Sequence, residues 1–253
     1  MDYSIESHGL TKIYNGQPVV NRLNLRIERG TFCGFLGPNG AGKSTTIKML
    51  TGVLAPSSGY ARILGNNLKH DTLAIKKRIG VVPEDQCLFE NLTAPEYLVF
   101  IGRMYGLPKD VALDRSHELL DALGLADASK TLILEFSTGM KKKLALCAAL
   151  IHDPEILFLD EPFEGVDAIA SRTIRAVLEQ ARARGATIFL TSHILEIVER
   201  LCSHVYVIHE GQLIFQGSLE TLAQGSRLDE AFLKLVAHGQ QENTQLSWLG
   251  ASH

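Results

Sequence analysis

Apolar and polar positions follow two different patterns along this chain. In the first third, and again after residue 155, short apolar runs alternate with segments that have helical spacing. The runs 31–36 and 156–160 are almost unbroken, which is typical of strands buried on both faces of a parallel sheet. From about residue 93 to 151 the spacing is helical. This arrangement predicts an α/β core with a helical insertion.

The same pattern predicts individual elements, and the imperfect alternation over 20–27 favours a half-exposed antiparallel strand. Thr93, Pro95 and Glu96 indicate a helix start, because they combine a capping hydroxyl, an early proline and an acidic first turn. The expected strands are 20–27, 31–36, 60–64, 79–82, 156–160, 187–191, 205–208 and 213–215. The expected helices are 43–50, 93–104, 110–123, 139–151, 171–184, 194–201 and about 228–238.

Composition places the chain among ordinary globular proteins. Of its 253 residues, 45% are apolar and 21% are charged, so the chain is long enough to bury a sizeable core. The net charge of −3 does not favour a nucleic-acid partner, and none is expected. Isolated cysteines at apolar positions predict buried thiols in a reducing compartment, and they are Cys33, Cys87, Cys147 and Cys202.

Targeting signals are not visible in the sequence. The N-terminus has no basic region followed by an apolar run, as a secretion signal would. No apolar stretch approaches the ~18 residues that a membrane-crossing helix needs. The sequence therefore predicts a cytosolic protein, and a role at the membrane would require a partner.

A glycine-rich segment between the strand 31–36 and the following helix fits the pattern G-x-x-x-x-G-K-S. Glycines let backbone N–H groups converge on a phosphate, and a helix N-terminus adds a favourable dipole. We expect Lys43 to reach the β- and γ-phosphates of a nucleotide and Ser44 to ligate Mg²⁺. An ordinary glycine turn is the alternative, but the flanking strand and helix favour phosphate binding. The segment is Gly37, Pro38, Asn39, Gly40, Ala41, Gly42, Lys43, Ser44 and Thr45.

Paired carboxylates end the second buried strand. Asp160 lies where open α/β sheets bind ligands and can hold a metal-bound water, while Glu161 can orient or deprotonate that water. Two acidic residues that merely end a strand are the alternative, which the phosphate loop makes less favoured. His193 follows the strand 187–191 and can sense the γ-phosphate, although a lone histidine is more often structural.

Two further features have competing interpretations. Tyr14 precedes the glycine loop and can stack on adenine, or it can simply pack at a strand end. Ser137 and Gly139 open a helix and can be an ordinary cap, or they can face the γ-phosphate with a second helix N-terminus. The lysine run that follows, 141–143, is expected to be a solvated helix face with no catalytic part.

In this order and spacing, these segments resemble the ATP-binding subunit of ABC transporters, from about residue 5 to 236. The resemblance implies that Tyr14 stacks on adenine and that 37–45 is the Walker A loop. It implies that Asp160 is the Walker B aspartate, Glu161 the catalytic glutamate and His193 the switch histidine. Residues 136–140 match the signature turn, and Asp167 lies in a loop that crosses a dimer interface.

The fold that the resemblance implies is a P-loop NTPase, RecA-like core sheet with an antiparallel β subdomain and an inserted α-helical subdomain. We expect one ATPase domain over 3–240, with a polar tail at 241–253. Its core would comprise about 3–85 and 152–220, its helical subdomain about 86–151, and its C-terminal helix about 228–238. The implied cofactors are ATP and Mg²⁺.

The resemblance also implies partners. The signature of one subunit, including Ser137 and Gly139, completes the ATP site of the other in a head-to-tail homodimer or heterodimer. A separate integral membrane permease would place the protein on the cytoplasmic face of the cell membrane. We therefore expect an ATP-hydrolysing motor subunit that powers transport. Soluble ABC-type ATPases of translation or DNA repair, and P-loop kinases, are the alternatives.

The sequence departs from the family pattern in several places. Glu84 stands where the family usually has a glutamine near Mg²⁺, and Gln86 is another candidate for that amide. Thr138 replaces a signature glycine, which requires a negative φ, and Met140 replaces the signature glutamine. Phe163 replaces a common threonine and should affect packing. Glu84 and the S-x-G-M-K form are similar to the branch that exports drugs, antibiotics or polysaccharides, and the metal ligands expected are Ser44, Asp160 and Glu84.

Overall fold

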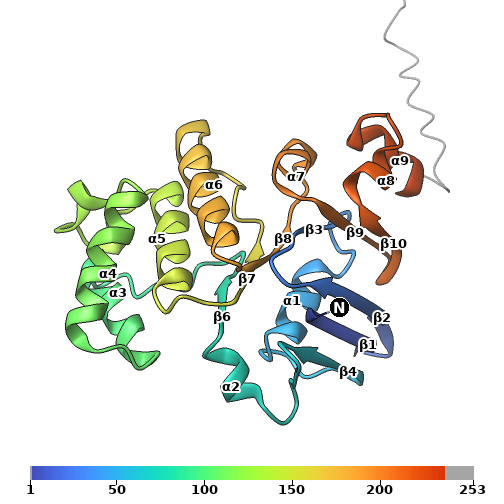
Figure 1. The fold of residues 1–253 in the computed structure, drawn as a ribbon, viewed down its shortest axis with the longest axis horizontal. Helices are drawn as coiled ribbons and strands as arrows, with labels where there is room; N and C mark the ends of the chain where they lie inside the picture. Colours follow the sequence, from blue (N-terminus) through green and yellow to red (C-terminus); the bar gives the residue numbers. More distant parts are fainter. Residues whose placement is uncertain (1, 237–253) are drawn as a thin grey trace, which may run out of the picture.

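A computed structural model describes residues 2–236 and contains two β-sheets with helices packed around them (Figure 1). The larger sheet has six strands in the order β10-β9-β3-β8-β7-β6, and the smaller has four in the order β2-β1-β4-β5. The strands are β1 (Tyr3–Tyr14), β2 (Gln17–Glu28), β3 (Phe32–Leu36), β4 (Ser58–Ile63), β5 (Asn66–Asn67), β6 (Ile79–Val82), β7 (Ile156–Asp160), β8 (Thr187–Thr191), β9 (His204–His209) and β10 (Gln212–Ser218).

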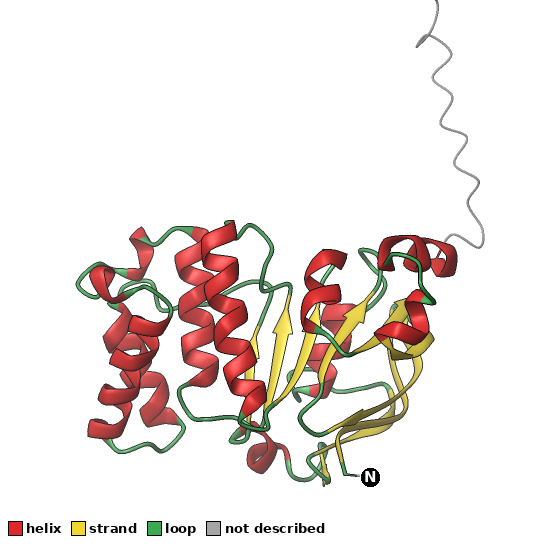
Figure 2. Cartoon of the chain, turned by 45° about the horizontal axis from the view of Figure 1, so that its top comes forward, coloured by secondary structure: helices red, strands yellow, loops and turns green. Residues whose placement is uncertain are grey.

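Helices lie beside the larger sheet, and some of them extend away from it (Figure 2). The α-helices are α1 (Lys43–Leu50), α2 (Thr72–Lys76), α3 (Ala94–Met104), α4 (Lys109–Ala122), α5 (Thr138–Leu150), α6 (Ala168–Ala183), α7 (Leu195–Leu201), α8 (Leu219–Ala223) and α9 (Leu228–Val236). Two short 3₁₀ turns are η1 (Ala126–Ala128) and η2 (Ile133–Glu135). Among the described residues, no helix combines the length and apolar character needed to cross a bilayer.

The strands β3, β8 and β7 form the parallel centre of the larger sheet. Every residue of these strands is buried, including the polar Asp160, Thr187 and Thr191 at their ends, and their apolar interiors predict this burial. β8 pairs with both neighbours, so Thr191 lies opposite Phe35 on one side and Asp160 on the other. This register brings the ends of β3 and β7 to the same edge, with β8 between them.

Each face of the larger sheet has its own apolar core. Phe35, Phe158 and Phe189 pack toward α1 and the antiparallel sheet. The ring centroid of Phe189 lies 5.2 Å from that of Phe35 and 5.6 Å from that of Phe158. On the opposite face, alternate residues such as Leu157 and Ile188 pack against helices that include α5, α6 and α7. The alternation of side chains along a strand therefore fixes α1 on one face and α5 on the other.

The helices α3, α4 and α5 form a unit at the end of the molecule away from the antiparallel sheet (Figure 1). α3 begins where predicted: Thr93 caps it, and Glu96 accepts a hydrogen bond from the Thr93 N–H at 2.9 Å. α5 also packs on β6 and α6, so it joins the helical unit to the larger sheet. A movement of α5 would therefore change its packing against both the helical unit and the larger sheet.

The predicted α/β core and helical insertion are confirmed, but the sequence pattern missed some elements. The strand β1 was not predicted, because it is irregular. Several register shifts interrupt its pairing with β2, and Gly9 within it has a φ of +56°. The short helices α2 and α8 also went unpredicted. The last residues of the expected C-terminal helix, the end of the domain at 240 and the tail 241–253 lie outside the described residues.

The cysteine prediction holds for three thiols and is wrong for one. Cys33, Cys147 and Cys202 are buried, and burial raises the pKa of each above its usual range. Cys87 is exposed because it lies in the loop after β6 rather than in a packed element. All four are free thiols.

Candidate nucleotide site

The glycine loop connects β3 to α1 and packs closely against neighbouring backbone. A Cβ on Gly37 would lie 2.3 Å from the carbonyl oxygen of Ile208, and one on Gly42 would lie 2.7 Å from that of Val19. Gly42 also has a φ of +104°, in the left-handed region that favours glycine. These two positions therefore require glycine, and they fix the shape of the loop at the N-terminus of α1.

Lys43 is the first residue of α1, and its ammonium lies between the loop and β7. Its Nζ donates hydrogen bonds to the carbonyl oxygens of Gly37 at 2.8 Å and Pro38 at 3.3 Å. The same Nζ is 3.8 Å from Glu161 Oε1, and both side chains are buried. The structure thus brings together the lysine and the glutamate that the sequence predicted.

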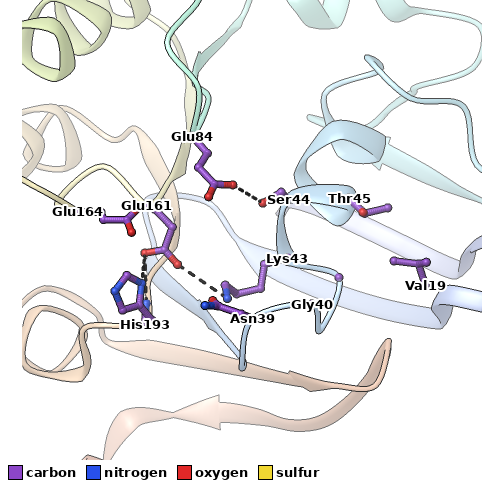
Figure 3. Close-up of a pocket in the computed structure, with 11 residues that line it drawn as sticks. Val19, Asn39, Gly40, Lys43, Ser44, Thr45, Glu84, Glu161, Glu164 and His193 are labelled. Atoms are coloured by element: carbon purple, nitrogen blue, oxygen red, sulfur yellow. Dashed lines mark hydrogen bonds and ion pairs between the residues drawn. The ribbon is translucent and has the colours of Figure 1, made fainter. Parts of the chain in front are cut away.

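Glu161 follows β7 with a φ of +48°, a left-handed conformation that is uncommon for a residue with a side chain. Its N–H donates to Thr191 Oγ1 at 3.0 Å. Its Oε2 accepts from the His193 N–H at 3.3 Å and lies 3.0 Å from His193 Nδ1 (Figure 3). Strained backbone persists where surrounding contacts determine it, and these contacts fix the Glu161 carboxylate in the pocket.

Asp160 is the last residue of β7 and is almost fully buried. Its Oδ1 accepts a hydrogen bond from Thr191 Oγ1 at 2.6 Å, so one threonine contacts both Asp160 and Glu161. Thr191 was not predicted from the sequence. The signal that could have found it is a polar residue at the carboxyl end of an apolar strand, next to the strand that carries the acidic pair.

Glu84 follows β6 and is joined to the start of α1. Its Oε2 accepts a hydrogen bond from Ser44 Oγ at 3.2 Å. Gln86, the other candidate for this position, instead donates its amide to the Glu84 backbone carbonyl at 3.1 Å and does not line the pocket. The hydroxyl and carboxylate oxygens of Ser44, Glu84 and Asp160 are ligands of the type that Mg²⁺ prefers.

A pocket opens over the glycine loop and contains most of the predicted site (Figure 3). It is lined by Val19, Asn39, Gly40, Gly42, Lys43, Ser44, Thr45, Glu84, Glu161, Glu164 and His193. Glu164 was not predicted, and it adds a carboxylate to this wall. Pro38, Ala41 and Asp160 belong to the loop and strand that support the pocket.

Tyr14 is outside the set of pocket-lining residues. It is 44% exposed at the end of β1, and Lys12 Nζ lies 5.2 Å from the centroid of its ring. The residue of this hairpin that lines the pocket is Val19, on β2. The expected contact between Tyr14 and adenine therefore stays a prediction.

The predicted signature turn begins α5, away from the pocket of the same chain. Ser137 caps the helix by accepting from the Met140 N–H at 3.3 Å, which agrees with the cap interpretation. Thr138 has no positive φ, so the condition for replacing a glycine is met. Asp167 caps α6, and hydrogen bonds from the N–H groups of Ala170 and Ile169 lower the pKa of its carboxyl. A Cβ on Gly139 would lie 4.0 Å from Asp167 Oδ2, so the two segments are neighbours.

Lys142 contradicts the expectation that the lysine run 141–143 is a solvated face. It is buried, and its Nζ donates to the Glu161 carbonyl oxygen at 2.9 Å. Helical spacing could have indicated this, because the apolar residues Ala145, Leu146 and Ala149 lie three, four and seven positions later and are also buried. Lys141 remains partly exposed and pairs with Glu90.

A phosphate-type glycine loop opens a helix at the end of one buried parallel strand. Acidic residues end another strand two places away in the same sheet. Together, this fold and site define a P-loop nucleotide hydrolase.

The model of the ABC transporter family matches residues 20–164, more than half of the chain, and the chain therefore belongs to this family as its ATP-binding, ATP-hydrolysing subunit. The bacitracin transport ATP-binding protein BcrA of Bacillus licheniformis is 41% identical over 90% of this chain and 74% of its own length. The daunorubicin/doxorubicin resistance ATP-binding protein DrrA of Streptomyces peucetius is 36% identical over 96% of this chain and 73% of its own length.

Solved structures agree with the fold. An ATP-binding subunit of an ABC transporter superposes with a TM-score of 0.86 at 31% identity, covering 91% of this chain and 98% of the other. A dimeric ATP-binding cassette in a post-hydrolysis state, bound to ADP and phosphate, has a TM-score of 0.80 at 22% identity, covering 85% and 98%. The expected P-loop NTPase fold is confirmed.

Proposed function

We propose that this chain hydrolyses ATP to power the export of a drug-like or antibiotic compound through a separate integral membrane permease. The observation that carries the hydrolytic part is the buried Glu161 carboxylate, held beside Lys43 and His193 in the pocket. The names of the bacitracin transport and drug resistance relatives support the export part. They favour a transporter over a soluble ATPase of translation or DNA repair.

In this proposal the glycine loop and Lys43 bind the phosphates of ATP. The backbone N–H groups at the start of α1 and the Lys43 ammonium stabilise negative charge on the β- and γ-phosphates. Ser44, Asp160 and Glu84 supply oxygen ligands for Mg²⁺, which neutralises charge on the phosphoryl oxygens when bound. The existing Ser44–Glu84 hydrogen bond supports this, since it places two of the three ligand groups within 3.2 Å.

Glu161 is the proposed catalytic carboxylate. It orients a water molecule for in-line attack on the γ-phosphate and accepts a proton from it, giving ADP and phosphate. His193 contacts Glu161 through its backbone N–H and its ring, so we propose that it positions the carboxylate and senses the γ-phosphate. Tyr14 is proposed to stack on adenine when nucleotide is bound.

We further propose that two ATPase subunits assemble head-to-tail, as a homodimer or a heterodimer. Ser137, Gly139 and Asp167 are exposed or partly exposed and lie outside the pocket of their own chain, which suits contact with the ATP of a second subunit. The cytoplasmic face of the cell membrane is the proposed location, because ATP is used there.

The exposed side of α3, together with the loop before it, is the proposed contact with the permease. Phe89, Phe100 and Met104 are 52%, 43% and 70% exposed, and the rings of Phe89 and Phe100 lie 5.5 Å apart. Grouped exposed apolar side chains mark interaction surfaces more often than isolated ones do.

The test of the hydrolytic assignment is Glu161→Gln. Removing a general base is expected to lower kcat by about 100-fold or more, while ATP still binds because the loop and Lys43 are intact. Steady-state phosphate release and equilibrium binding of ATP measure the two effects. Glu118→Gln makes the same charge change on the exposed surface of α4 and serves as the control. Hydrolysis by Glu161→Gln at the parent rate would show that another group activates water.

A further inference from the structure

Lys142 connects α5, the helix that begins at the predicted signature turn, to the proposed catalytic residue Glu161 of the same chain. It lies in the second turn of α5, whose N-terminal residues are Ser137 and Gly139. Its side chain is only 6% exposed, and its Nζ donates to the Glu161 carbonyl oxygen at 2.9 Å. The bond therefore crosses from the helical unit to the end of β7.

The charge around Lys142 is mostly negative. Burial lowers the pKa of its ammonium, while the carboxylates of Glu164, Glu161 and Glu84 act in the opposite direction. A buried cation is costly unless nearby opposite charge and hydrogen bonds compensate, and here the charges of these carboxylates and the hydrogen bond to the Glu161 carbonyl act in that direction. The lysine is thus buried behind the pocket, on the backbone of Glu161, rather than exposed to solvent.

Glu161 needs such contacts because its backbone is in the left-handed region, with a φ of +48°. Its N–H is fixed by Thr191 and its carboxylate by His193 and Lys43. The remaining polar group, the carbonyl, accepts from Lys142 Nζ at 2.9 Å and from the Glu164 N–H at 3.3 Å, so the lysine supplies the shorter of its two hydrogen bonds and the one that comes from another element. Since a left-handed residue is held by its surrounding contacts, loss of the Lys142 bond would leave only the longer Glu164 bond on the carbonyl and would loosen the position of the side chain.

α5 is a continuous helix, so its N-terminus and Lys142 move together. A displacement of Ser137 and Gly139 by a second subunit would be transmitted to Lys142 about a turn and a half away. The bond from Lys142 has an ordinary length of 2.9 Å, and lengthening it by about 1 Å would break it.

We propose that Lys142 is a positioning residue that couples the placement of α5 to the backbone of Glu161. Contact at the signature end of α5 would then adjust the water-activating carboxylate in the same chain. This inference rests on the proposed role of Glu161. It assigns the lysine no direct contact with ATP.

The experiment compares Lys142→Met and Lys142→Arg in the full chain. Methionine keeps most of the buried stem but removes the donor, leaving the Glu161 carbonyl with only the 3.3 Å hydrogen bond from the Glu164 N–H. We expect kcat for ATP hydrolysis to fall about ten-fold, with KM and the Kd for ATP within two-fold of the parent. Arginine retains the charge and the donor and should recover most of the rate. Lys141→Met, which removes the neighbouring lysine and its pair with Glu90, should leave kcat unchanged.

A double-variant cycle separates positioning from general damage. In the Glu161→Gln background, Lys142→Met should have no further effect on the residual rate, because both changes act through one carboxylate. A parent-like kcat for Lys142→Met, or an equal further loss in the Glu161→Gln background, would overturn the inference. If Glu161→Gln itself hydrolyses normally, the proposed function fails first, and that result is distinct from a failure at Lys142 alone.

Discussion

The Glu84 carboxylate, which accepts a hydrogen bond from Ser44, adds a negative charge to the proposed metal site. Two carboxylates, Glu84 and Asp160, would face the ion, where the family pattern has one carboxylate and one amide. A charged oxygen attracts a divalent cation more strongly than an amide oxygen does. The substitution at position 84 is therefore expected to increase the affinity for Mg²⁺.

Glu84→Gln tests this expectation. Replacing the charged ligand with an amide should raise the free Mg²⁺ needed for half-maximal ATPase activity by about ten-fold, while kcat at saturating Mg²⁺ changes less. A titration of Mg²⁺ at fixed ATP measures it, with Glu118→Gln as the charge control on α4. An unchanged Mg²⁺ requirement would remove Glu84 from the ligand set.

Single residues were predictable where their spacing in the sequence is fixed. The loop 37–45 and the pair Asp160–Glu161 could be identified because each is contiguous and follows a buried strand. For Thr191 and Lys142, local patterns could indicate a strand end and a buried helix position, but not the partners that each contacts, since those lie far along the chain. Thr191 meets Asp160 through the register of β7 and β8, and Lys142 meets Glu161 through the packing of α5.

At the scale of elements, short ion pairs join strands that the sequence separates widely. Glu155, just before β7, accepts from Arg78 at the start of β6, with 2.8 Å between Arg78 Nη2 and Glu155 Oε2. Arg29, before β3, contacts the same carboxylate at 3.4 Å. The N–H groups of Glu155 and Ile156 also donate to the Arg78 carbonyl. Side chains and backbone thus fix the same end of the sheet.

This cluster predicts a pH-dependent contribution to stability. The hydrogen bond from Arg78 lowers the pKa of Glu155, so its stabilisation is present above the unfolded-state pKa and is lost as pH falls through the lower folded-state pKa. Because these side chains are 35% and 41% exposed, solvent screening limits the effect to about 0.5–1 kcal/mol. Glu155→Gln should therefore unfold at lower urea than the parent at pH 7.

The difference between Glu155→Gln and the parent should narrow as the pH falls toward about 4, where the parent carboxylate begins to protonate. Urea midpoints across that pH range measure it, and Glu179→Gln on the exposed face of α6 is the control. A difference that stays constant with pH would mean that packing, rather than the charge of Glu155, is responsible.

Element types were predictable from periodicity, and their pairing was not. The buried strands β3, β7 and β8 stand out because they are short and have apolar interiors, with polar residues only at the ends of β7 and β8. Their order, with β8 between β3 and β7, depends on long-range packing that no local pattern specifies. β1 was missed for a local reason, since its bulges disrupt the alternation that identifies a strand.

At the scale of the whole molecule, the proposed ATP site divides into two surfaces. The pocket holds Lys43 and Glu161, whereas Ser137, Gly139 and Asp167 lie at the adjoining ends of α5 and α6. A single chain therefore supplies both surfaces without joining them. Two chains in head-to-tail order would place the signature of each against the pocket of the other.

Ser137→Arg tests this arrangement. A large side chain should block contact with a second subunit and abolish hydrolysis, yet leave ATP binding by the single chain intact because Ser137 is outside its pocket. Phosphate release and the Kd for ATP are the measurements. Ser137→Ala, which loses only the cap, should reduce stability by about 1 kcal/mol and retain much of the rate. Loss of ATP binding in Ser137→Arg would contradict a site shared between chains.

The position of β3 in the sheet also affects how the protein is made. β3 pairs Phe32 with Ile188 and Cys33 with His204, so the strand before the glycine loop has both neighbours far downstream. Closing such long loops is slow and entropically unfavourable. During synthesis on the ribosome, the glycine loop leaves the exit tunnel well before β8 and β9, the strands that pair with β3, have been made. ATP can therefore stabilise the fold only late in synthesis, once those strands have emerged.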